Sequence, residues 1–216
     1  MKKMQLETLP IDAADERLPG ELLFRHSARI LGSRVAVTYA LNLKEHRRRM
    51  RLDFGALEHE ATLAALLDMP TDDLSPIAPR FEHLLEGHLD HQAVAVTISD
   101  VDNRRWGRRL LQVPVRLVGA DIAEASPPRA MATAHRWNGY TARWLTLPRA
   151  PRNSDLFLLE ASHYGVGVRV AEGDDYECRE LVQPVPYSPR RLTAARWALS
   201  ELVYGQFLTL TNEASD

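Results

Sequence analysis

The feature that most constrains the fold is a strict alternation of side chains from Arg34 to Leu43. The odd-numbered positions from Val35 to Leu43 are apolar or aromatic, and the even-numbered positions between them are small or polar. Because successive side chains of a strand point to opposite faces, this pattern predicts a strand with one buried face. Such a face must be covered by helices or by a second sheet.

Shorter patterns predict more strands and the turns between them. Lys44 to Arg49 and Asp102 to Arg109 are rich in arginine and lie between apolar alternations, so each is expected to form the tip of a hairpin. The expected strands are Met50 to Phe54, Ala93 to Ser99, Leu110 to Val118, Tyr140 to Leu147, Asp155 to Ala161, Tyr164 to Val170 and Tyr176 to Val182.

A long helix is expected at the C-terminal end. Ser188 suits the N-cap and Pro189 the first helical position. The helical period then gathers Leu192, Ala195, Leu199, Leu202, Val203 and Gln206 on one face, which should be buried. Apolar spacing predicts shorter helices at Glu21 to Leu31, Gly55 to Met69 and Arg80 to Leu89.

These elements indicate an α+β fold, with a largely antiparallel sheet built from hairpins and packed by the C-terminal helix and two shorter helices, Glu21 to Leu31 and Gly55 to Met69. We expect a flexible arm at 1–19, a single domain at 20–212 with a sub-boundary at the proline-rich 70–79, and a frayed tail at 213–216. VAVT occurs at 35–38 and again at 94–97, each after a Phe-X-His triplet, which suggests either a duplicated unit or two independent hairpins.

The composition sets limits on the class of protein. Of the 216 residues, 45% are hydrophobic and 26% charged, as in an ordinary globular chain. The one cysteine, Cys178, allows no internal disulfide and favours a reducing cytoplasm. No run approaches the roughly 18 apolar residues of a membrane span, so no membrane partner is expected.

Although the net charge is −2, positive charge is concentrated in four segments, Lys44 to Arg51, Asn103 to Arg109, Pro148 to Arg152 and Pro189 to Arg196, of which the first two are the expected hairpin tips. Arginines that neutralise phosphates, beside a tryptophan that stacks on a base, would suit nucleic acid. The alternative is that both tips are solvated turns, with the tryptophan folded back on the sheet. The candidate contact residues are Arg47, Arg48, Arg49, Arg104, Arg105, Trp106, Arg108 and Arg109.

Two carboxylates near the ends of one expected strand suggest metal chemistry. With Asp155 opening it and Glu160 near its end, the segment resembles the metal-binding hairpin of the PD-(D/E)XK nuclease-like families over about ten residues. The resemblance implies a divalent metal held by Asp155 and Glu160. It departs at Ser162, where the pattern has a lysine, so a degenerate relative without activity is also open.

Other candidate sites are incomplete. Ser162 and His163 could serve as nucleophile and base, but neighbouring residues on a strand point apart. His83, His88 and His91 are potential metal ligands, although Gly87 should interrupt the helix between them. No phosphate-binding glycine loop is present, so no nucleotide cofactor is implied.

Three classes of function therefore remain. The first is a non-catalytic binding or accessory subunit of a larger assembly, associated with a protein partner, an oligomer or nucleic acid. The alternatives are a metal-dependent nuclease and an unspecified small-molecule enzyme. The first is favoured because every candidate catalytic set lacks a member, whereas basic and aromatic tips suffice for binding.

Overall fold

A computed structural model describes residues 7–8, 21–85, 94–98, 104–152, 154–172, 177–187 and 191–213. The chain divides into two compact units. Unit 1 comprises Met1–Leu18, Leu22–Ala40 and Leu117–Arg190, and unit 2 comprises Pro19–Glu21, Leu41–Arg116 and Arg191–Asp216, in each case as far as the structure describes them. The predicted sub-boundary at 70–79 lies inside unit 2.

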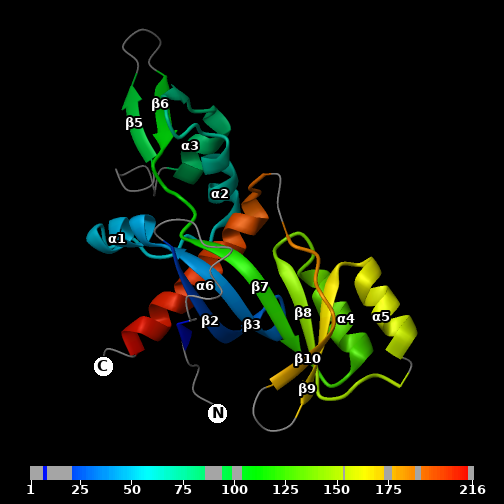
Figure 1. The fold of residues 1–216 in the computed structure, drawn as a ribbon. Coiled ribbons are helices and arrows are strands. Elements are labelled where there is room, and N and C mark those ends of the chain that lie inside the picture. Colours follow the sequence, from blue (N-terminus) through cyan, green and yellow to red (C-terminus); the bar gives the residue numbers. More distant parts are fainter. Residues whose placement is uncertain are drawn as a thin grey trace. The chain divides into compact units, whose positions relative to one another are not determined.

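Unit 1 is built on a seven-stranded sheet (Figure 1). The strand order is β1-β2-β3-β7-β8-β9-β10, and β1 and β10 pair antiparallel with their neighbours β2 and β9. The strands are β1 (Glu7–Thr8), β2 (Glu21–Ile30), β3 (Ser33–Asn42), β7 (Val115–Ala123), β8 (Ala142–Leu147), β9 (Val166–Glu172) and β10 (Glu177–Val182). The strands predicted from the alternations at 34–43, 140–147, 164–170 and 176–182 are confirmed.

The helix predicted for Glu21 to Leu31 is wrong, because this segment is strand β2. It forms a hairpin with β3 through a two-residue turn at Leu31 and Gly32, whose φ angles are 51° and 78°. Positive φ at both central residues matches the right-handed twist of a hairpin. In strand geometry Leu23 and Ile30 are still buried, so the same apolar residues serve a different element.

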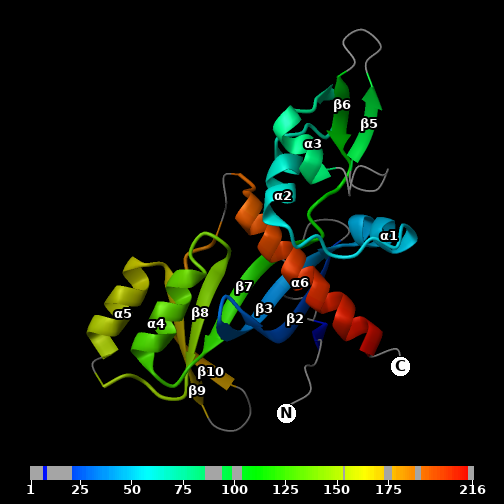
Figure 2. The same ribbon diagram turned by 180° about the vertical axis from the view of Figure 1, so that it is seen from behind.

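Parallel pairing at the centre of the sheet was not predicted. Strand β8 pairs parallel with both β7 and β9. Parallel neighbours need crossover connections, and these are α4 (Pro127–Arg136) and α5 (Ser154–His163). Figures 1 and 2 show these helices side by side, and they pack against β8 and β9. Helix α5 was expected to be a strand.

Unit 2 combines helices with a small antiparallel sheet. Its core is formed by Leu57, Leu63, Ala65, Leu66, Met69, Ile77, Leu85, Val94, Leu111 and Trp197. The sheet order is β4-β6-β5. The elements are α1 (Leu43–Arg51), α2 (Glu60–Leu67), β4 (Ser75–Pro76), α3 (Pro79–Leu85), β5 (Val94–Ile98), β6 (Arg105–Arg109) and α6 (Ala194–Glu213).

Several predictions for this unit change. The returning strand at Met50 to Phe54 is wrong, because its first residues end α1. The partner of β5 is β6 and not Leu110 to Val118, because Val94 pairs with Arg109 and Ile98 with Arg105. The duplication is also excluded, since the first Phe-X-His triplet lies on strand β2 and the second on helix α3. Helix α2 confirms the helix expected within Gly55 to Met69.

The α+β class and the long C-terminal helix are confirmed. Helix α6 begins at Ala194, later than predicted, and the proposed caps Ser188 and Pro189 lie outside the described residues. Leu199 is buried as expected, while Leu202 is half-buried. Among the described helices, none is both long and apolar enough to cross a membrane.

Thr193 provides the N-terminal cap of α6. Its hydroxyl oxygen accepts a hydrogen bond from the backbone N–H of Arg196 at 3.3 Å. Replacing Thr193 by alanine should therefore lower the free energy of unfolding by about 1 kcal/mol in urea denaturation. Thr209→Ala is the control, because the Thr209 hydroxyl bonds the Gly205 carbonyl inside the helix, where alanine is the better helix former. Equal losses for both variants would contradict the capping role.

Candidate nucleic-acid interface

The segment predicted as a basic hairpin tip, Lys44 to Arg49, is part of helix α1. The side-chain oxygen of Asn42 accepts a hydrogen bond from the Glu45 N–H at 3.2 Å, which caps the helix. Glu45 lies in the first turn and Arg48, Arg49 and Arg51 in the last, an order that complements the helix dipole. These local preferences explain why the segment is helical.

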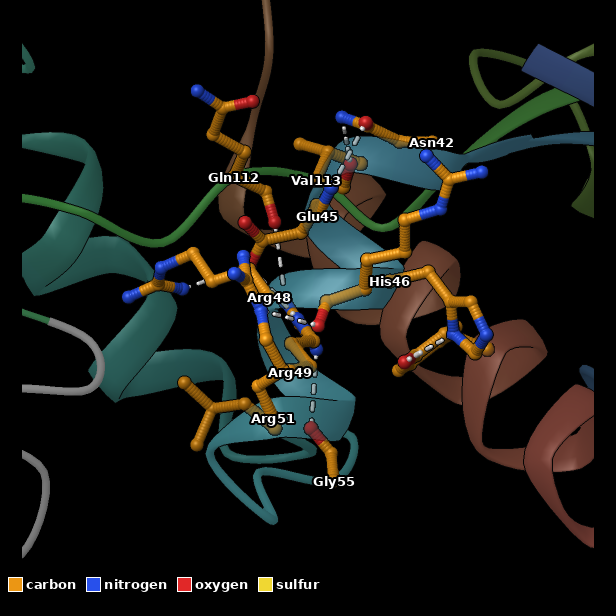
Figure 3. A network of polar contacts seen from close by, with 12 residues as sticks. Asn42, Glu45, His46, Arg48, Arg49, Arg51, Gly55, Gln112 and Val113 are labelled. Atoms are coloured by element: carbon orange, nitrogen blue, oxygen red, sulfur yellow. Dashed lines mark hydrogen bonds and ion pairs between the residues drawn. The ribbon is translucent and has the colours of Figure 1, made fainter. Parts of the chain in front are cut away.

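One face of α1 is buried through Arg49. Its guanidinium is fully buried and contacts both carboxylate oxygens of buried Glu201 at 2.7 Å, while its Nε donates to Glu45 at 2.9 Å. Nη1 and Nη2 also donate to the carbonyls of Gly55 and Gln112, each at 3.1 Å. All five N–H donors of the guanidinium are thus used. Figure 3 shows Arg49 with Glu45, Gly55 and Gln112.

The surroundings of Glu201 complete this buried network. Its carboxylate accepts hydrogen bonds from the Leu57 backbone N–H at 3.0 Å and from the Trp197 indole N–H at 2.8 Å. The two carboxylates raise the pKa of Arg49 despite its burial. The ring of Tyr204 lies 5.1 Å from the guanidinium carbon, and burial raises the Tyr204 pKa to about 12. The network fixes α1 against α6.

The opposite face of α1 carries only positive charge. Lys44, Arg47 and Arg51 are exposed, and the side chain of Arg48 is 22% exposed and pairs with Glu45 at 3.2 Å. The spacing i, i+3, i+4, i+7 places these four residues on one side of the helix. We call them the α1 basic stripe. Glu45, the sole acidic residue of α1, is buried on the other side.

His46 lies at the edge of the buried network. Its Nδ1 is 3.0 Å from the Tyr204 hydroxyl, and its ring meets that of Phe207 edge-on at 5.6 Å. Burial, and then the neighbouring charges of Arg47 and Arg49, lower the pKa of His46. The histidine therefore helps to position α1 and adds no charge to the stripe at neutral pH.

The second predicted tip, Asp102 to Arg109, is largely strand β6, and its first two residues lie outside the described chain. Gly107 faces the core of unit 2: a Cβ placed there would lie 2.6 Å from Met69 Cε and 3.0 Å from Ile77 Cδ1. By alternation, Trp106 and Arg108 point to the other side. Arg108 is exposed and Trp106 half-buried. We call these two, with exposed Arg104, the β6 outer face.

Two predicted contact residues are not available for binding. Arg49 is fully buried in the network above. Arg109 lies with its guanidinium carbon 5.0 Å from the Trp197 ring, and its Nε and Nη1 are enclosed without a hydrogen-bond partner in the described chain. Burial accordingly lowers the Arg109 pKa. Arg105 is half-buried, on the same side of β6 as Gly107.

The carboxylates Asp155 and Glu160 do not flank a strand, because Ser154–His163 is helix α5. The metal-binding hairpin that the segment resembles is therefore not formed. Both side chains are exposed, and five residues of helix turn them about 140° apart. Ser162 and His163 are adjacent and exposed at the end of α5, with no hydrogen bond between them in the structure as described.

The histidine cluster is described only in part. His83 is exposed on α3, and His88 and His91 lie outside the described residues. Within the described ranges, no three His, Cys, Asp or Glu side chains are grouped so that they could hold a metal ion.

Comparisons with protein families, with curated proteins and with solved structures found no match to this chain. The α1 basic stripe and the β6 outer face are thus interpreted from their own geometry.

Proposed function

We propose that this protein is a non-catalytic binding subunit that contacts nucleic-acid phosphates through the α1 basic stripe. The observation that carries the proposal is the stripe itself: four cations on one side of a helix whose other side is fixed by the buried Arg49–Glu201 pair. A helix rises 1.5 Å per residue, so Lys44 to Arg51 spans about 10 Å. Phosphates of one strand follow at about 3.4 Å along the axis, so this length suits about three of them.

The buried anchor supports the proposal energetically. Ordering flexible side chains and backbone on binding opposes association. Helix α1 is already held by hydrogen bonds from Arg49 to Glu45, Glu201 and two carbonyls, so its backbone needs no ordering when phosphates bind. Phosphate contacts of this kind carry affinity and little sequence preference.

The β6 outer face supplies the chemistry for unpaired bases. The half-buried Trp106 has a flat ring for stacking, and its indole N–H is enclosed. Arg108 lies on the same side of the strand, and exposed Arg104 lies just before the strand. This face would favour single-stranded nucleic acid, whereas the stripe alone binds either form.

The test is binding of fluorescently labelled single- and double-stranded DNA and RNA at low salt. Trp106→Ala should weaken single-strand binding by about 1–3 kcal/mol and leave its salt dependence unchanged, because stacking releases no counterions. Trp106→Phe is the matched control, since it keeps an aromatic ring and should retain most of the affinity. Equal affinity of wild type and Trp106→Ala for single strands would remove the stacking role, and a folded wild type that binds none of the four probes would remove the proposal.

A further inference from the structure

Unit 1 contains a cavity of about 310 Å³, and none of the described residues that line it is acidic. Thr141, just before β8, and Arg143, the second residue of β8, contribute to its wall. His163, the last residue of α5, and Tyr164, which follows it, contribute as well. The remaining lining residues are Asn138, Gly165, Val185, Pro186 and Tyr187. We call this space the Arg143 cavity.

The segment after β10 forms a fixed wall of the cavity. The Val185 N–H donates to the Gly165 carbonyl at 3.2 Å, and the Tyr187 hydroxyl donates to the Gly139 carbonyl. Gly165 has φ 65°, and a Cβ there would lie 3.0 Å from Val185 Cβ. Position 165 therefore requires glycine, which allows the segment to approach so closely.

Arg143 is buried, and no described carboxylate pairs with it. Arg143 as a whole is 8% exposed. Within the described chain its guanidinium makes one hydrogen bond, from Nη2 to the Tyr164 carbonyl at 2.6 Å. The contrast with Arg49 is direct: there two carboxylates and two carbonyls use every donor, and the pKa is raised. Burial lowers the pKa of Arg143, and an unpaired buried charge is costly.

The hydroxyl of Thr141, two residues before Arg143, lacks a hydrogen-bond partner in the described chain. Thr141 is 2% exposed. The hydrogen bond from Arg143 to the Tyr164 carbonyl caps the C-terminus of α5. This bond uses one of the five guanidinium donors, and it does not explain why the Thr141 hydroxyl is buried. The guanidinium of Arg143, with donors left over, and the Thr141 hydroxyl belong to residues that line one cavity, which points to a ligand that supplies acceptors to both.

We propose that the Arg143 cavity binds the carboxylate of a small organic acid. The planar guanidinium matches a carboxylate in a forked pair, and the Thr141 hydroxyl donates to it. A carboxylate balances the single positive charge, whereas a phosphate dianion would leave a negative charge buried. The Tyr164 ring, which meets His135 and His163 edge-on at 4.6 and 5.0 Å, offers an apolar surface for the rest of the molecule.

The probes are benzoate, phenyl phosphate and neutral benzyl alcohol, tested on the full chain by thermal shift and calorimetry. Benzoate should raise the Tm of the wild type, phenyl phosphate should do so less, and benzyl alcohol should not. Arg143→Gln should weaken benzoate binding about tenfold or more. Arg149→Gln, which removes an exposed charge of unit 1, is the matched control and should bind like the wild type.

Thr141→Val separates binding from folding. It removes a buried hydroxyl that lacks a partner, so the ligand-free protein should keep or gain thermal stability, while benzoate binding weakens about fivefold. No Tm rise with benzoate, or equal binding by wild type and Thr141→Val, would overturn the proposal. Stronger binding of phenyl phosphate than of benzoate would overturn the assignment of a carboxylate.

Discussion

Replacing Arg49 by methionine is expected to lower the free energy of unfolding by about 3–5 kcal/mol. The reason is that Glu45 and Glu201, exposed by 2% and 0%, would lose the one cation that both contact. Glu45 would keep only Arg48, and Glu201 would have no cation among the described residues. A buried carboxylate without a counter-charge must take up a proton or unfold the region. Urea denaturation at neutral pH, monitored by circular dichroism, measures the loss directly.

Arg47→Met is the control on the same helix, because Arg47 is exposed and its replacement should change stability by less than about 0.5 kcal/mol. The double variant Arg49→Met with Glu201→Leu should recover part of the loss, since it removes the buried carboxylate that Arg49→Met alone leaves without a cation. If Arg49→Met and Arg47→Met unfolded at the same urea concentration, the buried network would not hold α1 in place.

Strand β3 and helix α6 were predicted correctly because each has a long hydrophobic pattern with one regular period. Strand β3 alternates over ten residues, and α6 keeps Leu199 and Val203 on one buried face over many turns. In both elements the hydrophobic pattern fits a single period, so no competing structure buries the same side chains.

Segments with ambiguous patterns account for the errors. The apolar residues of β2 fit either a helix or a strand, and its turn uses Leu31 and Gly32 in place of the usual asparagine-glycine pair. The apolar run of α5 is too short to distinguish the two by period. Reading α5 as a strand also concealed the helical crossovers that make β7, β8 and β9 parallel.

The two arginine-rich segments were predicted to be hairpin tips, but they form helix α1 and strand β6. Composition alone could not separate Arg49, which is buried, from exposed Arg47. A signal was present in α6, where Glu201 follows Trp197 by four residues on an otherwise apolar face. A carboxylate at such a position predicts a buried cation elsewhere in the chain. The Arg143 cavity had no comparable signal, because its described lining comes from three separate segments, 138–143, 163–165 and 185–187.

The salt dependence of binding tests the α1 basic stripe most directly. The triple variant Lys44→Gln, Arg47→Gln and Arg51→Gln should bind DNA more weakly. Its plot of log affinity against log salt, between about 50 and 200 mM, should be less steep than that of the wild type by about three units, one for each lost phosphate contact. The matched control replaces Arg29, Arg129 and Arg149, exposed arginines of unit 1, by glutamine. This control should keep the wild-type slope, and equal slopes for the two triple variants would rule out phosphate binding through the α1 basic stripe.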